Sequence, residues 1–194
     1  MSNDFRSARY WAAEIIGPAL YDGAQAIDAT MGNGHDTQWL CECVGENGRV
    51  YAFDVQREAV ERTRERLDQA GLIERACLHC LGHERMGEVV PERVDAVMFN
   101  LGWLPGAAHG VTTHTQTTLK AVNAAIELLK PDAVMTICVY PGHDEGAREL
   151  HALEAWAAAL DPARFDVMLR RYLNQPNDPP QLFAVKRKRL RGEV

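Results

Sequence analysis

The stretch that decides the fold of this chain is Ala26-Ile27-Asp28-Ala29-Thr30-Met31-Gly32-Asn33-Gly34-His35-Asp36-Thr37. A short apolar run ends in an acidic residue, a glycine-rich turn follows it, and a helix then begins. The glycines let the backbone approach a ligand closely, and the first turn of a helix offers N–H groups that have no partner inside the helix. The stretch therefore predicts a nucleotide-type cofactor at the end of a first parallel strand.

The spacing of the glycines favours one kind of cofactor. Gly32 and Gly34 are separated by one residue, but Thr37 stands where a dinucleotide-binding fold has its third glycine. Asp54 follows Gly32 by 22 residues and ends the next apolar run, where a carboxylate accepts hydrogen bonds from both ribose hydroxyls. These residues favour S-adenosyl-L-methionine over NAD.

Apolar runs alternate with helical patterns along the whole chain. We expect strands at residues 24–29, 49–54, 76–81, 94–99, 133–140, 165–169 and 182–185, and helices at 7–20, 57–70, 115–129 and 146–160. A further helix is expected after a cap at Asp36 or Thr37, and Pro131 is expected to end the helix that starts at 115.

This order of elements predicts an α/β fold. Repeated βα units give a parallel sheet with helices on both faces, and two final strands joined without a helix give an antiparallel edge hairpin. We expect a Rossmann-like, seven-stranded, mostly parallel sheet in a single domain over residues 1–194. A leading helix segment (1–22) precedes the first strand, and a basic tail (186–194) follows the last one.

The composition is that of a globular protein with unevenly distributed charge. The 194 residues carry 21 basic and 27 acidic side chains, and the formal net charge of −6 argues against a general nucleic-acid coat protein. Five of the basic residues lie at 186–191, where they either guide a polyanion or form the solvated end of the last strand. No apolar run reaches the length of a membrane span, and Glu14 interrupts the apolar patch after Arg9, so we expect neither a membrane segment nor a signal peptide.

The five cysteines predict no metal site. Cys77 and Cys80 have the spacing of zinc ligands, but their segment has the pattern of a buried strand, in which cysteine acts as a small apolar residue. Reduced thiols are the default in the cytoplasm, where we expect this protein to work. Trp11 and Ile15 on the leading helix belong either to the core or to a contact with a second copy of the chain, a homodimer.

The candidate cofactor residues lie at the ends of the first four predicted strands. Asp28 either holds the loop backbone or receives the ammonium group of the cofactor, because a buried carboxylate needs a partner. The segment Gly82-His83-Glu84 ends the third strand, and we expect it beside the adenine. The complete predicted set is Asp28, Thr30, Gly32, Asn33, Gly34, His35, Asp36, Thr37, Asp54, Gln56, Gly82, His83 and Asn100.

Further candidates follow the fourth and fifth strands, on the edge where ligands bind in open α/β sheets. Asn100 can orient a nitrogen nucleophile, and Trp103 either stacks on a base or serves as packing. Tyr140 and His143 lie on the same edge, and His143 is a candidate proton acceptor. Thr112, Thr113 and Thr115 are expected to cap the following helix.

Four segments together resemble the YtqB-like methyltransferases: Asp28-Ala29-Thr30-x-Gly32-Asn33-Gly34-His35-Asp36-Thr37, Asn100-Leu101-Gly102-Trp103-Leu104-Pro105-Gly106, Tyr140-x-Gly142-His143 and Asn174-Gln175-x-Asn177-x-Pro179-Pro180. The resemblance covers residues 8–187 and implies a class I S-adenosyl-L-methionine-dependent methyltransferase fold. For the MnmM-type members of this family it implies methylation of the 5-aminomethyl group of (2-thio)uridine at tRNA position 34, with the anticodon stem-loop as partner. The chain departs from the family at 107–114, where a charged stretch with a lysine is usual, and at Trp103, where tyrosine is common.

The implied reaction is a direct displacement, in which an amine lone pair attacks the sulfonium methyl group and catalysis consists mainly of positioning. We predict that Asn100 orients the amine and that Tyr140 or His143 lies near the path of its proton. Substrate binding is assigned to Leu101, Gly102, Trp103, Leu104, Pro105 and Gly106. Three alternatives stay open: a methyltransferase of rRNA or of a small-molecule amine, an NAD-dependent enzyme, and an RNA-binding module without catalysis.

Overall fold

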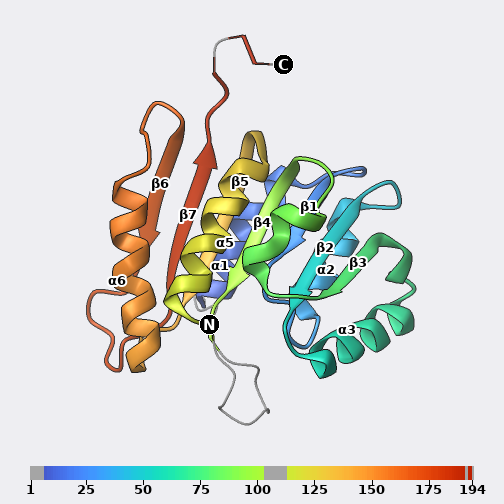
Figure 1. The fold of residues 1–194 in the computed structure, drawn as a ribbon, viewed down its shortest axis with the longest axis horizontal. Helices are drawn as coiled ribbons and strands as arrows, with labels where there is room; N and C mark the ends of the chain where they lie inside the picture. The colour runs from blue at the N-terminus through green and yellow to red at the C-terminus, as the bar shows by residue number, and fades with distance from the viewer. Residues whose placement is uncertain (1–6, 103–112, 191, 194) are drawn as a thin grey trace, which may run out of the picture.

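The computed structural model describes residues 7–102, 113–190 and 192–193, and within them seven strands form one sheet in the order β3-β2-β1-β4-β5-β7-β6 (Figure 1). Strands β1 to β5 are parallel, whereas β7 runs antiparallel to both β5 and β6. The predicted mostly parallel sheet with an antiparallel edge is confirmed. The strands are β1 (Gln25–Asp28), β2 (Arg49–Asp54), β3 (Ala76–Cys80), β4 (Val94–Asn100), β5 (Leu129–Val139), β6 (Phe165–Arg170) and β7 (Gln181–Arg187).

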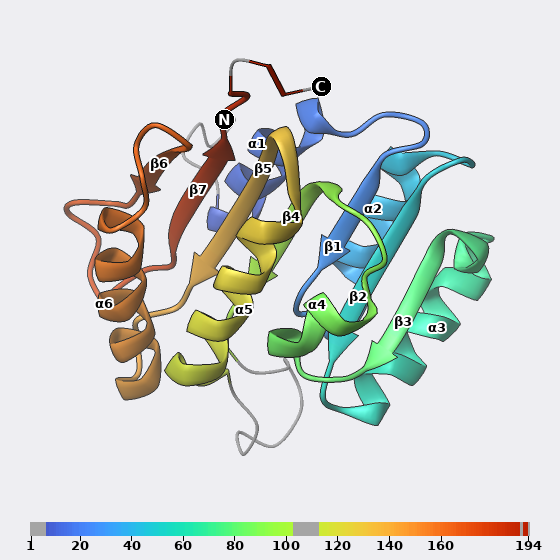
Figure 2. The same cartoon turned by 45° about the horizontal axis from the view of Figure 1, so that its top comes forward.

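Helices cover both faces of this sheet. Side chains of α1, α2 and α3 pack on one face against Ala26, Val50 and Met98, and those of α4, α5 and α6 pack on the other against Ile27 and Phe99. Neighbouring residues of a strand point to opposite faces, so each apolar strand contributes to both cores. Figure 1 shows α5 and α6 in front of the sheet with α1 and α2 behind it, and Figure 2 shows the same layers from a tilted view. The helices are α1 (Ala8–Ile16), α2 (His35–Val44), α3 (Arg57–Ala70), α4 (Met86–Val89), α5 (Thr115–Leu128) and α6 (Asp144–Ala158), with 3-10 turns η1 (Gly17–Ala19), η2 (Ile73–Arg75) and η3 (His83–Arg85).

The start of α2 differs from the prediction. The helix begins at His35, and its cap residue is Gly34, which has a φ of 78° and no side chain to cap with. Asp36 and Thr37 therefore lie inside the first turn, and neither is the cap.

The end of α5 also differs, because Pro131 does not terminate it. The helix ends at Leu128, and Pro131 lies inside β5. The register of β5 against β4 is irregular between Val94 and Ala96, and a sheet tolerates proline where the hydrogen-bond ladder is interrupted.

Helix α1 belongs to the core. The side chain of Trp11 is 2% exposed, and its ring lies 5.1 Å from the ring of Tyr172, with the Arg170 guanidinium 4.0 Å above it. Ile15 is partly buried against the same cluster. The apolar surface that suggested a second copy of the chain is thus covered by the protein's own β6–β7 connection.

The basic tail begins inside the sheet. Lys186 and Arg187 lie in β7, and the buried Arg187 binds the Leu129 carbonyl and the Glu193 carboxylate. Lys188 and Arg189 form ion pairs with Asp166 and Asp132 at 2.7 Å and 2.9 Å. Of the two readings of this run, the structure supports the solvated end of the last strand.

The segment with Cys77 and Cys80 is an edge strand rather than a buried one. Because β3 ends the sheet, Cys77 is only half-buried and Cys80 is exposed. Within the described residues no group of three or more histidine, cysteine or acidic side chains is arranged to hold a metal ion. None of the helices in those residues combines the length and the apolar character needed to cross a bilayer.

Candidate active site

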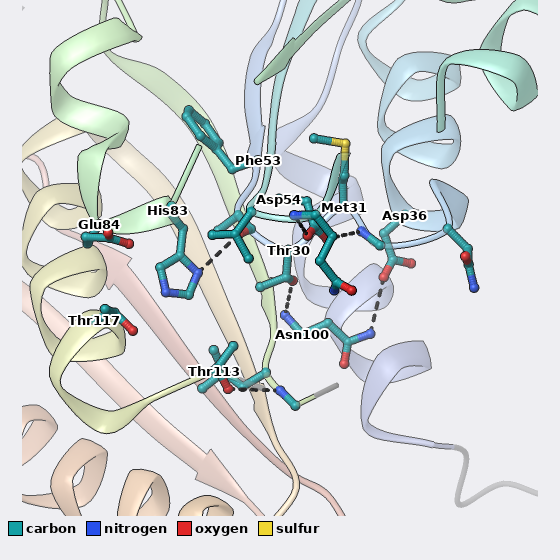
Figure 3. Close-up of a pocket in the computed structure, with 18 of the residues that line it drawn as sticks. Thr30, Met31, Asp36, Phe53, Asp54, His83, Glu84, Asn100, Thr113 and Thr117 are labelled. Carbon is teal, nitrogen blue, oxygen red and sulfur yellow. Dashed lines mark hydrogen bonds between the residues drawn. The ribbon is translucent and has the colours of Figure 1, made fainter. Parts of the chain in front are cut away.

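A cavity of about 540 Å³ opens at the carboxyl ends of β1, β2 and β4 (Figure 3). It brings together most of the predicted site residues: Thr30, Gly32, Asn33, His35, Asp36, Asp54, Gln56, Gly82, His83, Asn100, Leu101, Gly102 and Tyr140. The figure shows Asp36 and Asn100 on one side and His83, Glu84 and Thr117 on the other. Glu84, expected beside the adenine together with Gly82 and His83, also lines the cavity. Other lining residues were not predicted: Arg9, Ala29, Met31, Phe53, Val55, Thr113, His114 and Thr117. The predicted substrate residues Trp103, Leu104, Pro105 and Gly106 lie outside the described residues.

The buried carboxylate of Asp28 holds the glycine loop through hydrogen bonds. It is 1% exposed, and its two oxygens accept hydrogen bonds from the Thr30 N–H at 3.1 Å and the Thr37 hydroxyl at 2.6 Å. This pair of bonds ties the end of β1 to the first turn of α2. Asp28, Gly34 and Thr37 do not line the cavity. Of the two roles expected for Asp28, the structure shows the one that holds the loop backbone.

Burial gives Asp28 a measurable influence on stability. Burial, together with the nearby Asp36 carboxylate, raises the pKa of this carboxyl from 3.8 to about 7. Between pH 4 and 7 the unfolded chain therefore binds fewer protons than the folded one, and Asp28 lowers stability as the pH rises, by at most about 1.4 kcal/mol per pH unit. As the pH rises from 4 to 7, we expect the free energy of unfolding of Asp28→Asn to increase relative to that of the wild type. Above pH 7 this difference should stay constant.

The measurement is the free energy of unfolding in urea at several pH values from 4 to 8. Asp68→Asn, which changes an exposed carboxylate on α3, is the matched control and is expected to follow the wild type. If Asp28→Asn and the wild type show parallel pH dependence, the buried carboxyl does not hold its proton in the folded protein.

Gly34 is required where the loop turns into α2. A Cβ at this position would lie 2.8 Å from Oγ1 and 3.0 Å from Cα of Thr63, and the backbone is left-handed at φ 78°. The Thr63 hydroxyl donates to the Gly32 carbonyl at 3.1 Å, so α3 packs directly on the loop. Arg66 adds a second contact, from its Nε to the Asn33 carbonyl at 2.8 Å.

Replacement of Gly34 by alanine is expected to cost about 3 kcal/mol of folding free energy, from left-handed strain together with overpacking against Thr63. Gly71→Ala is the matched control, because Gly71 has a φ of 67° but open space around its Cβ position. That variant should cost only about 1 kcal/mol, from backbone strain alone. Chemical denaturation measures both, and equal losses would show that contact with Thr63 adds nothing.

Asp54 presents a carboxylate to the cavity from the end of β2. Its oxygens accept the N–H groups of Gly32 at 3.1 Å and Gln56 at 2.9 Å. Burial raises the pKa of Asp54, and these two hydrogen bonds oppose that rise. Each carboxylate oxygen has two lone pairs, so both retain capacity for the hydroxyl groups of a ligand.

His83 lies on the opposite wall. Its Nδ1 is 3.2 Å from the Ala29 carbonyl, which can only accept, so Nδ1 carries the hydrogen. Burial lowers the pKa of this imidazole, which favours the neutral ring. A neutral ring with a fixed tautomer gives the cavity a flat wall and an acceptor nitrogen at Nε2.

Asn100 is the centre of a hydrogen-bonded cluster. Its backbone N–H donates to Thr30 Oγ1 at 2.7 Å, its Nδ2 donates to Asp36 at 3.4 Å, and its Oδ1 accepts the Tyr140 hydroxyl at 2.8 Å. The Asp36 carboxylate also accepts Arg9 Nε at 2.6 Å. Burial raises the pKa of Tyr140 to about 12, so its hydroxyl keeps its proton at neutral pH and acts as a donor. Tyr140 thus fixes the Asn100 carboxamide by donating a hydrogen bond to it.

His143 does not belong to this cluster. It is the N-cap of α6, where its Nδ1 accepts the Gly146 N–H at 3.1 Å, and it does not line the cavity. The Nδ1 atom of His143 thus serves the start of a helix, and the predicted place of this residue on a proton path stays a prediction.

The residues on either side of the undescribed segment 103–112 are bonded to each other. Gly102 N–H donates to Thr113 Oγ1 at 3.0 Å, and Thr113 N–H donates to the Gly102 carbonyl at 3.1 Å. The Thr113 hydroxyl then donates to Glu149 at 3.0 Å, and Thr118 donates to the same carboxylate at 2.6 Å. Glu149 is 1% exposed, and burial raises its pKa. Thr113 is thus a link between β4 and α6 rather than a helix cap.

The family model described as "Putative rRNA methylase" matches residues 50–186. A relative described as tRNA (mnm(5)s(2)U34)-methyltransferase, chloroplastic, from Arabidopsis thaliana is 42% identical over 178 residues, which are 87% of this chain and 65% of the relative. The chain thus spans slightly less than two thirds of the length of that curated relative.

Solved structures show the same architecture. One described as a "putative rRNA-methylase" from Clostridium thermocellum superposes with a TM-score of 0.92 at 36% identity, covering 94% of this chain and 98% of that one. A "putative methyltransferase" from Streptococcus mutans, solved in complex with SAH, gives a TM-score of 0.86 at 36% identity, covering 94% and 99%. Given this match over most of its length, the chain belongs to the "Putative rRNA methylase" family and has the class I methyltransferase, Rossmann-like fold.

Proposed function

We propose that this protein is an S-adenosyl-L-methionine-dependent N-methyltransferase that acts on the 5-aminomethyl group of (2-thio)uridine at position 34 of tRNA. The observation that carries the proposal is that one cavity joins the glycine loop, the Asp54 carboxylate and the Asn100 cluster. Its volume lies within the range of about 300–1,000 Å³ that is usual for small-molecule sites. The Arabidopsis relative, whose name gives this tRNA reaction, supports the choice of substrate.

The cavity residues fit this cofactor. Asp54 would accept the ribose hydroxyls, Gly82 and His83 would border the adenine, and the loop at 30–36 would hold the amino-acid part. The cofactor would supply a methyl group on its sulfonium. Asn100 would orient the acceptor amine through the free lone pair of Oδ1, and Tyr140 would keep that carboxamide from rotating. An alkyl amine is protonated at neutral pH, and Asp36, bonded to Asn100, is the carboxylate that would take its proton.

The test uses a strain that lacks this protein. Nucleoside mass spectrometry of its tRNA should show unmethylated aminomethyl-uridine in place of the methylated form. Purified protein with labelled cofactor should then transfer label to that tRNA, and not to separated rRNA or metabolite pools. Label in rRNA or in a small amine, with none in tRNA, would refute the tRNA assignment while leaving the methyltransferase intact. We place this reaction in the cytoplasm.

A further inference from the structure

The β6–β7 connection lies beside the mouth of the cavity. β7 is antiparallel to β5, and Gln181 pairs with Val139, so the connection at 171–180 follows the sheet edge at which β5 ends. A Cβ at Gly142 would lie 3.7 Å from the Asn177 carbonyl, which places this connection next to the segment after Tyr140. Figure 1 shows the connection between β6 and β7 at the same end of the sheet as the carboxyl ends of β1, β2 and β4.

Helix α1 joins this connection to the cavity. The Trp11 ring contacts Tyr172, and the Arg170 guanidinium lies 4.0 Å above Trp11. Arg9, two residues before Trp11, extends to Asp36 on the cavity wall. Arg9 on α1 and the residues that follow β6, which pack on the buried Trp11, therefore lie near one another beside the cavity.

The chemistry of this surface differs from that of the whole protein. The chain has a net charge of −6, yet Arg9, Arg170 and Arg171 gather here. Arg171 is exposed and has no ion pair or hydrogen bond with the described part of the chain, and Leu173 is 87% exposed. Exposed amide side chains follow at Asn174, Gln175 and Asn177, and Asp178 supplies one opposing charge.

We propose that this surface, formed by Arg9, Arg170, Arg171, Leu173 and Asn174, binds the RNA strand next to the nucleotide in the cavity. The exposed Arg171 guanidinium, which has no partner in the described part of the chain, can pair with a phosphate, while apolar and amide side chains suit the faces and edges of unpaired bases. The proposal rests on the proposed function for the identity of the RNA, and adds where that RNA docks. Arg187, Lys188 and Arg189 of the basic run, which suggested a polyanion site in the sequence, are occupied by intramolecular contacts.

The experiment measures binding of a fluorescent anticodon stem-loop RNA by anisotropy at several salt concentrations, with S-adenosylhomocysteine present. Arg171→Gln is expected to weaken binding about 3- to 10-fold and to reduce the slope of log K against log salt by about 0.7, the value for one lost phosphate contact on a single strand. Leu173→Ala should weaken binding with an unchanged slope, because it removes an uncharged contact. Arg64→Gln changes another exposed arginine, on α3 near the opposite edge of the sheet; it is the matched control and should match the wild type. The KM for RNA should rise in Arg171→Gln by the same factor as the Kd, with kcat and the affinity for S-adenosylhomocysteine unchanged.

Two results would overturn this docking surface alone: Arg171→Gln binding RNA with wild-type affinity and slope, or Arg64→Gln losing as much as Arg171→Gln. If Arg171→Gln changes the oligomeric state measured by light scattering but not the RNA binding, the surface is occupied by a second copy of the chain. This result would also overturn the proposal. If the wild type binds S-adenosylhomocysteine but neither binds nor methylates the RNA, the tRNA assignment itself fails.

Discussion

Asp54→Ala is expected to weaken the binding of S-adenosylhomocysteine at least about 100-fold and to abolish turnover. A hydrogen bond to a charged group contributes about 1.5–3 kcal/mol, and the carboxylate is proposed to make two such bonds to the ribose, so their loss corresponds to at least two orders of magnitude. The variant also leaves the N–H groups of Gly32 and Gln56 without their acceptor, which loosens the loop itself. Isothermal titration calorimetry measures the affinity, and circular dichroism establishes that the protein is folded.

Asp54→Asn separates the two effects. The carboxamide keeps one acceptor oxygen for a backbone N–H but turns an amino group towards the other donor or the ligand, so we expect an affinity between those of the wild type and Asp54→Ala. A folded Asp54→Ala protein that binds S-adenosylhomocysteine as tightly as the wild type would show that Asp54 does not hold the ribose.

Asp54 could be predicted because its signal is local. An apolar run that ends in an acid, at a set distance after a glycine turn, predicts a strand, the position where the strand ends and a carboxylate at that position. All three predictions use only neighbouring residues. The bounds of α3 were likewise predicted at 57–70, because Gly71 ends the helix in a left-handed conformation whose N–H returns to Leu67. The same reasoning gave the cavity residues of the glycine loop and of the ends of β2, β3 and β4.

The residues that the sequence did not reveal owe their places to distant contacts. Arg9 reaches the cavity only because α1 packs behind the sheet and brings it 2.6 Å from Asp36, 27 positions along the chain. Glu149 contacts Thr113 and Thr118 from α6. In the sequence it is only an acidic residue one helical turn before the buried Leu153, and this pattern does not predict a contact with Thr113. His143 has a sequence pattern equally suited to a helix cap and to catalysis, and only the fold shows that its Nδ1 caps α6.

The Asn100 cluster has consequences that no single residue of it would have. The backbone N–H of Asn100 is tied to Thr30, and both ends of its side chain are tied to other elements, Oδ1 to β5 through Tyr140 and Nδ2 to α2 through Asp36. A carboxamide held at three points is preorganised, and reactions that depend on positioning lose most when such a group is removed. The cluster therefore predicts a large effect on kcat with a small effect on cofactor binding.

Asn100→Ala is expected to lower kcat about 100- to 1,000-fold, the range found when a preorganised hydrogen-bonding group is removed from an active site. The affinity for S-adenosylhomocysteine should change less than about threefold, because the bond to Thr30 uses the backbone N–H, which alanine retains. Single-turnover methylation of tRNA measures the first quantity and calorimetry the second. A variant with wild-type kcat but weakened cofactor binding would assign Asn100 to the cofactor alone.

Tyr140→Phe tests whether the tyrosine acts through Asn100. Removing the hydroxyl frees the carboxamide to rotate without deleting it, so kcat should fall only about tenfold, the effect of one hydrogen bond of about 1.4 kcal/mol. Once Asn100 is alanine, the hydroxyl has nothing left to orient, and the double variant should be no slower than Asn100→Ala. If the two losses multiply instead, Tyr140 contacts the substrate or its proton directly, and the role of a fixed donor deduced from its raised pKa is wrong.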